Sequence, residues 1–177
     1  MIYLFLADGF EEIEALGCTD ILRRAGLDVR TVGVTGKTVT SAHGIKVEAD
    51  VLVSDCVDGA EMVILPGGST GTNNLAASEA VASLVNDAAR GNAYVAAICA
   101  APTVLGGFGL LKGKRAVCYP GLEGRLTGAL HSDERVCVDG RFITSRGPGT
   151  TAEFALRIVE ILKGRDAADK LRKGMLW

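Results

Sequence analysis

Cys99 has sequence neighbours that suit a nucleophile. It follows the apolar segment 94–98 and precedes the small residues Ala100, Ala101 and Pro102, which predicts a sharp turn from a strand into a helix. A helix N-terminus lowers the pKa of a nearby thiol through its dipole and free N–H groups, and small neighbours leave room for a strained backbone and a substrate. A buried structural cysteine is the alternative, and this pattern alone leaves both open.

The other cysteines have no such setting, and we interpret them as core or surface thiols: Cys18, Cys56, Cys118 and Cys137. Five cysteines without a C-x-x-C pair argue against a disulfide framework and against a structural zinc site. Reduced thiols in the cytosol are the simpler interpretation. With only two histidines in the chain, a histidine-rich metal site is not expected, and we expect no metal or organic cofactor.

A glycine turn, Pro66-Gly67-Gly68, follows a second buried apolar segment. Two glycines allow close approach of the backbone and expose N–H donors. Together with the N–H of Ala100 they could form an oxyanion hole beside Cys99. From the motif alone, an ordinary tight turn is the simpler interpretation.

Three carboxylates, Glu11, Glu12 and Glu14, follow the first apolar segment. Acidic residues at a helix start usually face solvent and suit the helix dipole. Glu14 stands beside Ile13 and Leu16, near the expected inward stripe of the helix, and this mildly favours Glu14 as the partner of the cysteine.

The elements that must position these residues alternate between strands and helices, which predicts a flavodoxin-like, doubly wound α/β fold with a mostly parallel sheet and helices on both faces. Ligands of such sheets bind at the carboxyl ends of the strands, where Asp8-Gly9, the glycine turn and Cys99 fall. Ser78 is a predicted N-cap, and T-x-x-E at 150–153 is a predicted capping box. The expected strands are 2–7, 28–34, 62–65, 94–98, 115–118, 136–138 and 141–144, with a hairpin in 37–53; the expected helices are 11–25, 79–89, one from 101 onward and 150–162.

The bulk composition fits one domain over residues 1–177. The chain is 48% hydrophobic and 23% charged, with a net charge of −2. These values are ordinary for a globular protein and suggest neither nucleic acid nor a membrane as partner. The first ten residues suit a strand and a turn better than a signal peptide, so we expect a cytoplasmic protein.

Four sequence blocks together resemble the ThiJ/PfpI superfamily, in its DJ-one branch. They are A-D-G-F-E-E-I-E at 7–14, I-L-P-G-G at 64–68, A-A-I-C-A-A-P at 96–102 and S-R-G-P-G-T at 145–150. The resemblance covers essentially the whole chain. It implies that Cys99 is the reactive, oxidation-prone cysteine and that Glu14 hydrogen-bonds its sulfur. It also implies that Gly68 and Ala100 supply backbone donors, and that the protein forms a homodimer through faces that include the first helix.

The chain departs from its relatives at Tyr119, where the family often has a histidine. Tyrosine is a poor base at neutral pH, although it can donate a hydrogen bond, so the sequence argues against a cysteine–histidine dyad. His43 falls where a relative has a basic residue near the dimer contact. It could supply charge to the partner chain, or it could be an ordinary surface histidine. Gly67, Tyr119 and His43 are therefore pocket candidates.

The leading functional hypothesis is a cofactor-independent cysteine enzyme that acts on small reactive carbonyls. The activities implied by the resemblance are glyoxalase chemistry, from methylglyoxal to lactate, and a deglycase activity. A second hypothesis is a redox sensor or chaperone in which Cys99 is oxidised. A third is a cysteine amidase or peptidase, which the missing histidine disfavours.

Overall fold

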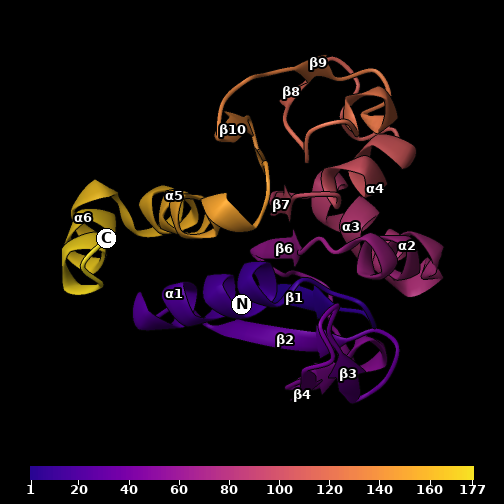
Figure 1. Ribbon diagram of the computed structural model, residues 1–177, viewed down its shortest axis with the longest axis horizontal. Coiled ribbons are helices and arrows are strands. Elements are labelled where there is room, and N and C mark those ends of the chain that lie inside the picture. Colours follow the sequence, from indigo (N-terminus) through magenta and orange to yellow (C-terminus); the bar gives the residue numbers. More distant parts are fainter.

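A seven-stranded sheet forms the centre of the computed structural model, which describes residues 1–177 (Figure 1). The strand order is β10-β11-β7-β6-β1-β2-β5, and every neighbouring pair is parallel except β10–β11. This is the expected doubly wound sheet. The strands are β1 Ile2–Leu6, β2 Val29–Gly33, β5 Val51–Leu52, β6 Met62–Leu65, β7 Tyr94–Ile98, β10 Val136–Asp139 and β11 Phe142–Ser145.

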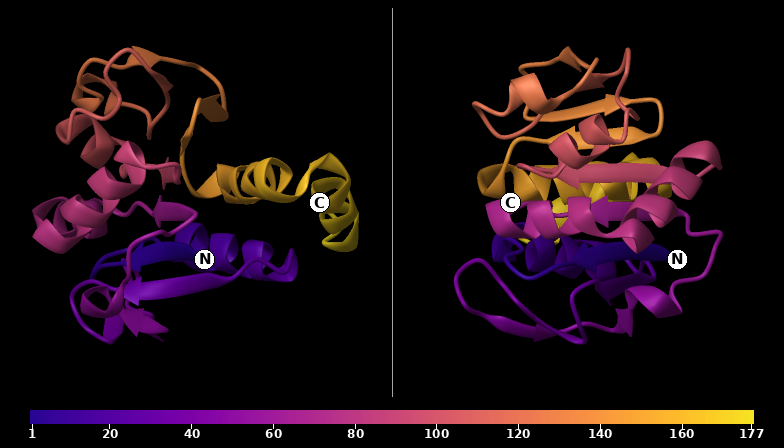
Figure 2. Two further views of the ribbon diagram at one scale, coloured as in Figure 1. Left: turned by 180° about the vertical axis from the view of Figure 1, so that it is seen from behind. Right: turned by 90° about the vertical axis from the view of Figure 1, so that its right-hand side faces the viewer.

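Helices cover both faces of the sheet and bury two apolar layers (Figure 2). Helices α1, α5 and α6 pack on one face, and α2, α3 and α4 pack on the other. The central strands are apolar on both sides because both faces are buried. The helices are α1 Cys18–Arg24, α2 Ser69–Ala77, α3 Glu79–Arg90, α4 Pro102–Gly107, α5 Thr151–Lys163 and α6 Arg165–Gly174.

The first predicted helix begins with a π-helical turn, η1, at Ile13–Gly17, which continues into α1. The expected inward stripe is therefore wrong at its start. Ile13 is 59% exposed, whereas Glu14 and Ala15 are fully buried. A π turn changes the angular step between residues, so a 3.6-residue pattern does not hold across it; such turns are frequent at functional sites.

Two small two-stranded sheets and several short turns lie outside the main sheet. The predicted hairpin is present as β3 Thr38–Thr40 and β4 Lys46–Glu48. The predicted strand 115–118 is shorter and lies outside the main sheet: β8 Arg115–Ala116 pairs with β9 Leu130–His131. Three short 3-10 turns complete the elements: η2 Val53–Asp55, η3 Glu123–Arg125 and η4 Pro148–Thr150.

The two predicted helix caps differ in outcome. Ser78 accepts a hydrogen bond from the N–H of Val81, as expected for an N-cap. The capping box of α5 is wrong: the hydroxyl of Thr150 bonds Ser145 and Gly147, and Glu153 pairs with Arg135. The 3-10 turn before α5 directs the Thr150 side chain toward the end of β11 instead.

The helices of the structure are too short or too polar to cross a lipid bilayer.

Candidate active site

Cys99 directly follows β7 in a strained backbone conformation. Its φ is +65°, and Leu176 at the C-terminus is the one other non-glycine residue with positive φ. Such a conformation costs about 1–3 kcal/mol and persists only where the surroundings fix it. Here the Cys99 N–H donates to the carbonyl of Ser145 over 2.9 Å, and the Cys99 carbonyl accepts from Tyr119 N–H over 2.8 Å. The backbone is thus held on both sides, and the sulfur lies above the carboxyl edge of the sheet.

The structure separates the roles of the three clustered carboxylates. Glu11 Oε2 accepts a hydrogen bond from the N–H of Glu14 over 2.8 Å. Glu12 turns toward the β3–β4 hairpin and binds Ser41 and His43. Glu14 is fully buried, whereas Glu11 and Glu12 keep 9% and 8% of their surface exposed. The sequence could favour Glu14 only weakly, and its burial now distinguishes it.

Gly67 brings the Glu14 carboxyl and the Cys99 sulfur to one place. The N–H of Gly67 donates to Glu14 Oε2 over 2.7 Å. A Cβ at Gly67 would lie 2.7 Å from that oxygen and 3.1 Å from Cys99 Sγ. Glycine is therefore required by space, because any side chain here would push into both groups. The other oxygen, Glu14 Oε1, is buried without a hydrogen-bond partner within the chain.

Burial dominates the ionisation of Glu14. Desolvation raises its pKa from 4.5 to about 7, although hydrogen bonds from Gly67 and Cys99 oppose this shift. A carboxyl with a pKa near neutrality is present in both its acid and its base form under ordinary conditions. That property suits a group that must accept and return a proton within one cycle.

The thiol pKa expected from the sequence is wrong in direction. Burial raises the pKa of Cys99, and the charge and hydrogen bond of Glu14 raise it further. Hydrogen bonds from the N–H groups of Gly68 and Ala100 lower it, but they do not outweigh burial. The helix-dipole argument omitted the buried carboxylate beside the sulfur. Burial and the neighbouring Glu14 therefore both favour the thiol form of Cys99 over the thiolate.

The N–H groups of the two predicted backbone donors, Gly68 and Ala100, both lower the pKa of the Cys99 thiol. Gly68 has a φ of +89°, and a Cβ there would clash with the carbonyl of Gly9 and the backbone of Phe10. Its N–H is thus directed by a turn that only glycine fits. Oxygen or sulfur anions that form at Cys99 would meet both donors.

A cavity of about 410 Å3 opens beside Cys99. Tyr119, a predicted pocket residue, is 48% exposed and lines it. Neither histidine of the chain lines it. Sequence reasoning missed Thr72 and Arg125, because one lies in a helix of low apolar periodicity and the other in a short loop turn. The lining residues are Ser69, Thr72, Asn73, Cys99, Ala100, Tyr119, Pro120, Gly121, Leu122 and Arg125. A larger cavity, of about 650 Å3, contains no cysteine or histidine and lies by the amino ends of β1 and β7.

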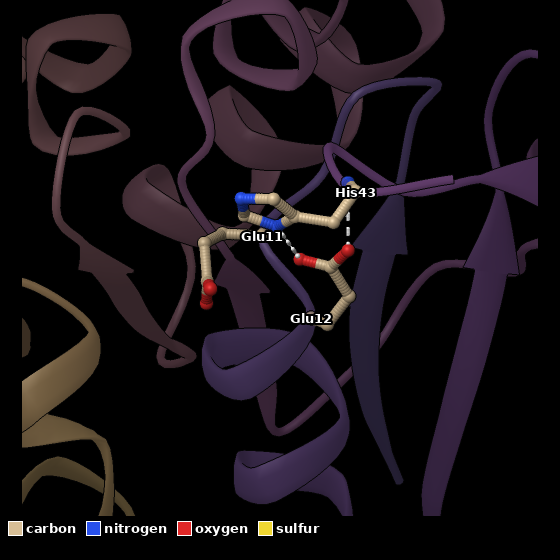
Figure 3. Close-up of side chains that lie close together, drawn as sticks. All are labelled: Glu11, Glu12 and His43. Carbon is tan, nitrogen blue, oxygen red and sulfur yellow. Dashed lines mark hydrogen bonds and ion pairs between the residues drawn. The ribbon is translucent and has the colours of Figure 1, made fainter. Parts of the chain in front are cut away.

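His43 lies in the turn between β3 and β4 and contacts Glu12 (Figure 3). It does not line the Cys99 cavity of its own chain. Its Nδ1 is 2.8 Å from Glu12 Oε2, and its N–H donates to Glu12 Oε1 over 2.7 Å. Burial raises the pKa of Glu12, but the bonds from Ser41 and His43 outweigh it and lower the pKa to about 2. The hydrogen bond and charge of Glu12 raise the pKa of His43. With Glu11, these side chains could offer ligands to a cation, yet hydrogen bonds already engage them.

The chain matches the model of the DJ-1/PfpI family over residues 1–161. Protein DJ-1 homolog B of Arabidopsis thaliana is 41% identical over 97% of the chain, which spans only 40% of that longer protein. A protein of Caenorhabditis elegans named "Glutathione-independent glyoxalase DJR-1.2" is 36% identical, over 92% of this chain and 88% of that one.

A solved structure titled "Toxoplasma gondii DJ-1, oxidized" superimposes with a TM-score of 0.96. It is 34% identical to this chain, and the match covers 99% of this chain and 97% of that one. The similarity to the DJ-one branch expected from four short blocks therefore extends to the whole fold.

Proposed function

Because the chain belongs to the DJ-1/PfpI family, we propose that it is a cofactor-independent glyoxalase that converts small 2-oxo aldehydes to 2-hydroxy acids. The observation that carries the proposal is the pairing of a buried Glu14, whose pKa is raised to about 7, with Cys99 beside an open cavity. The Caenorhabditis elegans relative, named as a glutathione-independent glyoxalase, supports the same class of reaction. The deglycase activity is a related alternative at the same thiol.

The reaction begins when Cys99 Sγ attacks the aldehyde carbon. The thiol proton passes to Glu14, and the N–H groups of Gly68 and Ala100 stabilise the oxygen anion that forms. Protonation of that oxygen by Glu14 completes the hemithioacetal. This order of steps explains how a thiol with a raised pKa can react: deprotonation accompanies attack, so no free thiolate is needed beforehand.

Glu14 then moves hydrogen between the two carbons. Its carboxylate removes the proton from the former aldehyde carbon, and the electron pair moves onto the ketone oxygen to give an enediolate. The hydroxyl proton of the first carbon passes to that oxygen while Glu14 returns its proton to the second carbon, and the first carbon becomes a thioester carbonyl. One carbon is oxidised and its neighbour is reduced, so the step needs no external oxidant. Water then cleaves the thioester to the 2-hydroxy acid and restores the Cys99 thiol.

Lactate formation from methylglyoxal tests this proposal directly. The purified protein is incubated with methylglyoxal in the absence of glutathione, and lactate is quantified over many turnovers. We expect sustained lactate production that Cys99→Ser abolishes. Lactate at no more than one equivalent per chain, or turnover that survives Cys99→Ser, would overturn the proposal.

Oxidation of Cys99 is a second candidate function, favoured by the same donors. The N–H groups of Gly68 and Ala100, together with a protonated Glu14, suit the oxygens of a sulfinate on Sγ. The Toxoplasma gondii structure is described as oxidized. Stoichiometric sulfinate formation with peroxide, without lactate turnover, would favour the sensor. The amidase alternative has no histidine in the cavity to act as its base.

We also infer a homodimer in the cytoplasm. Ile13, which follows Glu12, and Ile45, two residues after His43, are 59% and 51% exposed. Large apolar side chains on one exposed face are typical of an interface. The family resemblance implies that the first helix contributes to this contact, in which His43 would lie near the partner chain.

A further inference from the structure

Arg125 is the single charged residue that lines the Cys99 cavity. It ends the short turn η3, between Glu123 and the buried Leu126. Every other lining residue is apolar or neutral. A ligand that reacts at Cys99 therefore meets one positive charge and no fixed negative charge except the buried Glu14 behind the sulfur.

The guanidinium of Arg125 has no carboxylate partner in the chain. It takes part in none of the ion pairs of the structure. The acid of the same turn, Glu123, accepts instead from the N–H of Gly121 over 3.0 Å. Arginine presents several donors in a planar fork that matches a carboxylate. The donors of Arg125 are thus available to a ligand.

The backbone beneath Arg125 is held firmly. Its N–H donates to the carbonyl of Leu122, and Leu126 is only 5% exposed. A Cβ at Gly106 of α4 would lie 2.6 Å from the Arg125 carbonyl oxygen, so the turn packs directly on that helix. The residue is exposed, but its point of attachment at the cavity is fixed.

Thr72 supplies a second, independent observation at the same place. It is 2% exposed, and its Oγ1 is buried without any hydrogen-bond partner. Buried hydroxyl groups are normally paired, so an unpaired one at a cavity wall suggests a missing ligand atom. Thr72 and Arg125 both line the Cys99 cavity, and both also line an adjoining cavity of about 290 Å3.

We propose that Arg125 and Thr72 form a subsite for the carboxylate of a small carbonyl substrate whose aldehyde reacts at Cys99. The guanidinium would bind the carboxylate oxygens, and the Thr72 hydroxyl would donate to one of them. This deepens and rests on the proposed function: the preferred substrates are 2-oxo aldehydes with a terminal carboxylate, rather than neutral ones.

Matched substrates test the preference. The chain is assayed with 4,5-dioxopentanoate, an acidic 2-oxo aldehyde, and with 2-oxopentanal, a neutral one of similar length. The ratio of kcat/KM, acidic over neutral, should exceed one and should fall about tenfold in Arg125→Gln, because a charge-assisted hydrogen bond is lost. Arg125→Lys should restore part of the ratio. Arg165→Gln, on α6 across the sheet (Figure 1), should keep the wild-type ratio. An equal ratio in wild type and Arg125→Gln overturns the subsite.

Alkylation distinguishes failure of the subsite from failure of the proposed function. Iodoacetate and iodoacetamide react with the same thiol and differ in charge. Their rate ratio at Cys99, followed by mass spectrometry at one pH, needs no turnover and cancels changes in the thiol pKa. In Arg125→Gln, we expect the alkylation rate with iodoacetate to fall about tenfold relative to the rate with iodoacetamide. In Thr72→Val the ratio of the iodoacetate rate to the iodoacetamide rate should fall by a smaller factor. In Thr72→Ser this ratio should resemble that of the wild type.

Each outcome decides one of the two proposals. If no aldehyde is turned over but the alkylation ratio depends on Arg125, the glyoxalase proposal fails and the anion subsite stands. If both aldehydes are turned over and neither ratio depends on Arg125, the enzyme stands and the subsite is overturned. A ratio that shifts equally in Arg165→Gln also overturns the subsite, because a general effect of net charge would explain it.

Discussion

Glu14 Oε2 and the N–H of Gly67 are joined by a 2.7 Å hydrogen bond, and the missing side chain of the glycine leaves the space in which Glu14 faces Cys99. The donor is a main-chain group in the turn after β6, so it cannot rotate away. One turn therefore both orients the carboxyl and admits the sulfur. The geometry links three segments that are far apart in the chain: the π turn, the glycine turn and the end of β7.

Gly67→Ala should abolish turnover. Its Cβ would lie 2.6 Å from the Cβ of Cys99 and 2.7 Å from Glu14 Oε2, so the two reacting groups must move apart. We expect a loss of lactate production of about 10²-fold or more, since displacements of about 1 Å have effects of that size. Gly174→Ala in α6 is the control, because nothing lies near its added methyl group. Wild-type turnover by Gly67→Ala would contradict this geometry.

Glu14→Gln should abolish turnover, because the amide keeps the shape of the side chain but cannot accept a proton. General acid–base groups commonly contribute about 10²–10⁴-fold. Tyr119→Phe should lose much less, since the phenol has only a positioning or packing role at the rim of the cavity. Rates are compared with one carbonyl substrate, with Cys99→Ser as the inactive reference. If Tyr119→Phe is inactive while Glu14→Gln retains the wild-type rate, the base is the tyrosine.

The buried Glu14 should also make stability depend on pH. Its pKa is 4.5 when unfolded and about 7 when folded, so between these values the folded state holds a proton that the unfolded state has lost. The free energy of unfolding contributed by this group therefore falls as pH rises from about 4.5 to 7, by up to about 3 kcal/mol. Urea unfolding at several pH values measures this. The free energy of unfolding of Glu14→Gln should rise relative to that of the wild type as pH increases through this range. If the difference between the two free energies does not change with pH, Glu14 is not buried as a neutral acid.

Ile13→Lys should convert the proposed dimer to a monomer. A charged side chain at this 59% exposed position faces solvent in the single chain but would be desolvated in an interface. Sedimentation of the wild type should give twice 18.4 kDa. Leu130 on β9 is 60% exposed and provides the matched control. The Leu130→Lys variant should stay dimeric. A monomeric wild type would remove this proposal and any role of His43 across an interface.

Much of the fold could be predicted because local patterns and burial agree. The strands β6 and β7 begin and end where their apolar runs do. Helix α2 escaped prediction because its segment, rich in threonine and asparagine, shows little apolar periodicity. At the site, the elbow at Cys99 could be predicted from neighbouring residues, but the raised thiol pKa could not. That shift depends on a carboxylate 85 positions away in the chain, and only the folded structure brings Glu14 to the sulfur.

Removal of the Glu14 charge should increase the reactivity of Cys99 even though it abolishes turnover. In the wild type, burial and then the charge and hydrogen bond of Glu14 raise the thiol pKa. In Glu14→Gln the charge is absent, and the amide can donate a hydrogen bond to the thiolate. The thiolate fraction at neutral pH should then rise on the order of tenfold, with a pKa lowered by about one unit. Alkylation by iodoacetamide from pH 6 to 10, mapped by mass spectrometry, measures this rate at each cysteine. Cys18 and Cys137 are fully buried and should stay unlabelled in both proteins, which shows that the variant is folded. Slower alkylation of Cys99 in folded Glu14→Gln would mean that the carboxylate activates the resting thiol as a base, and the raised pKa would then be wrong.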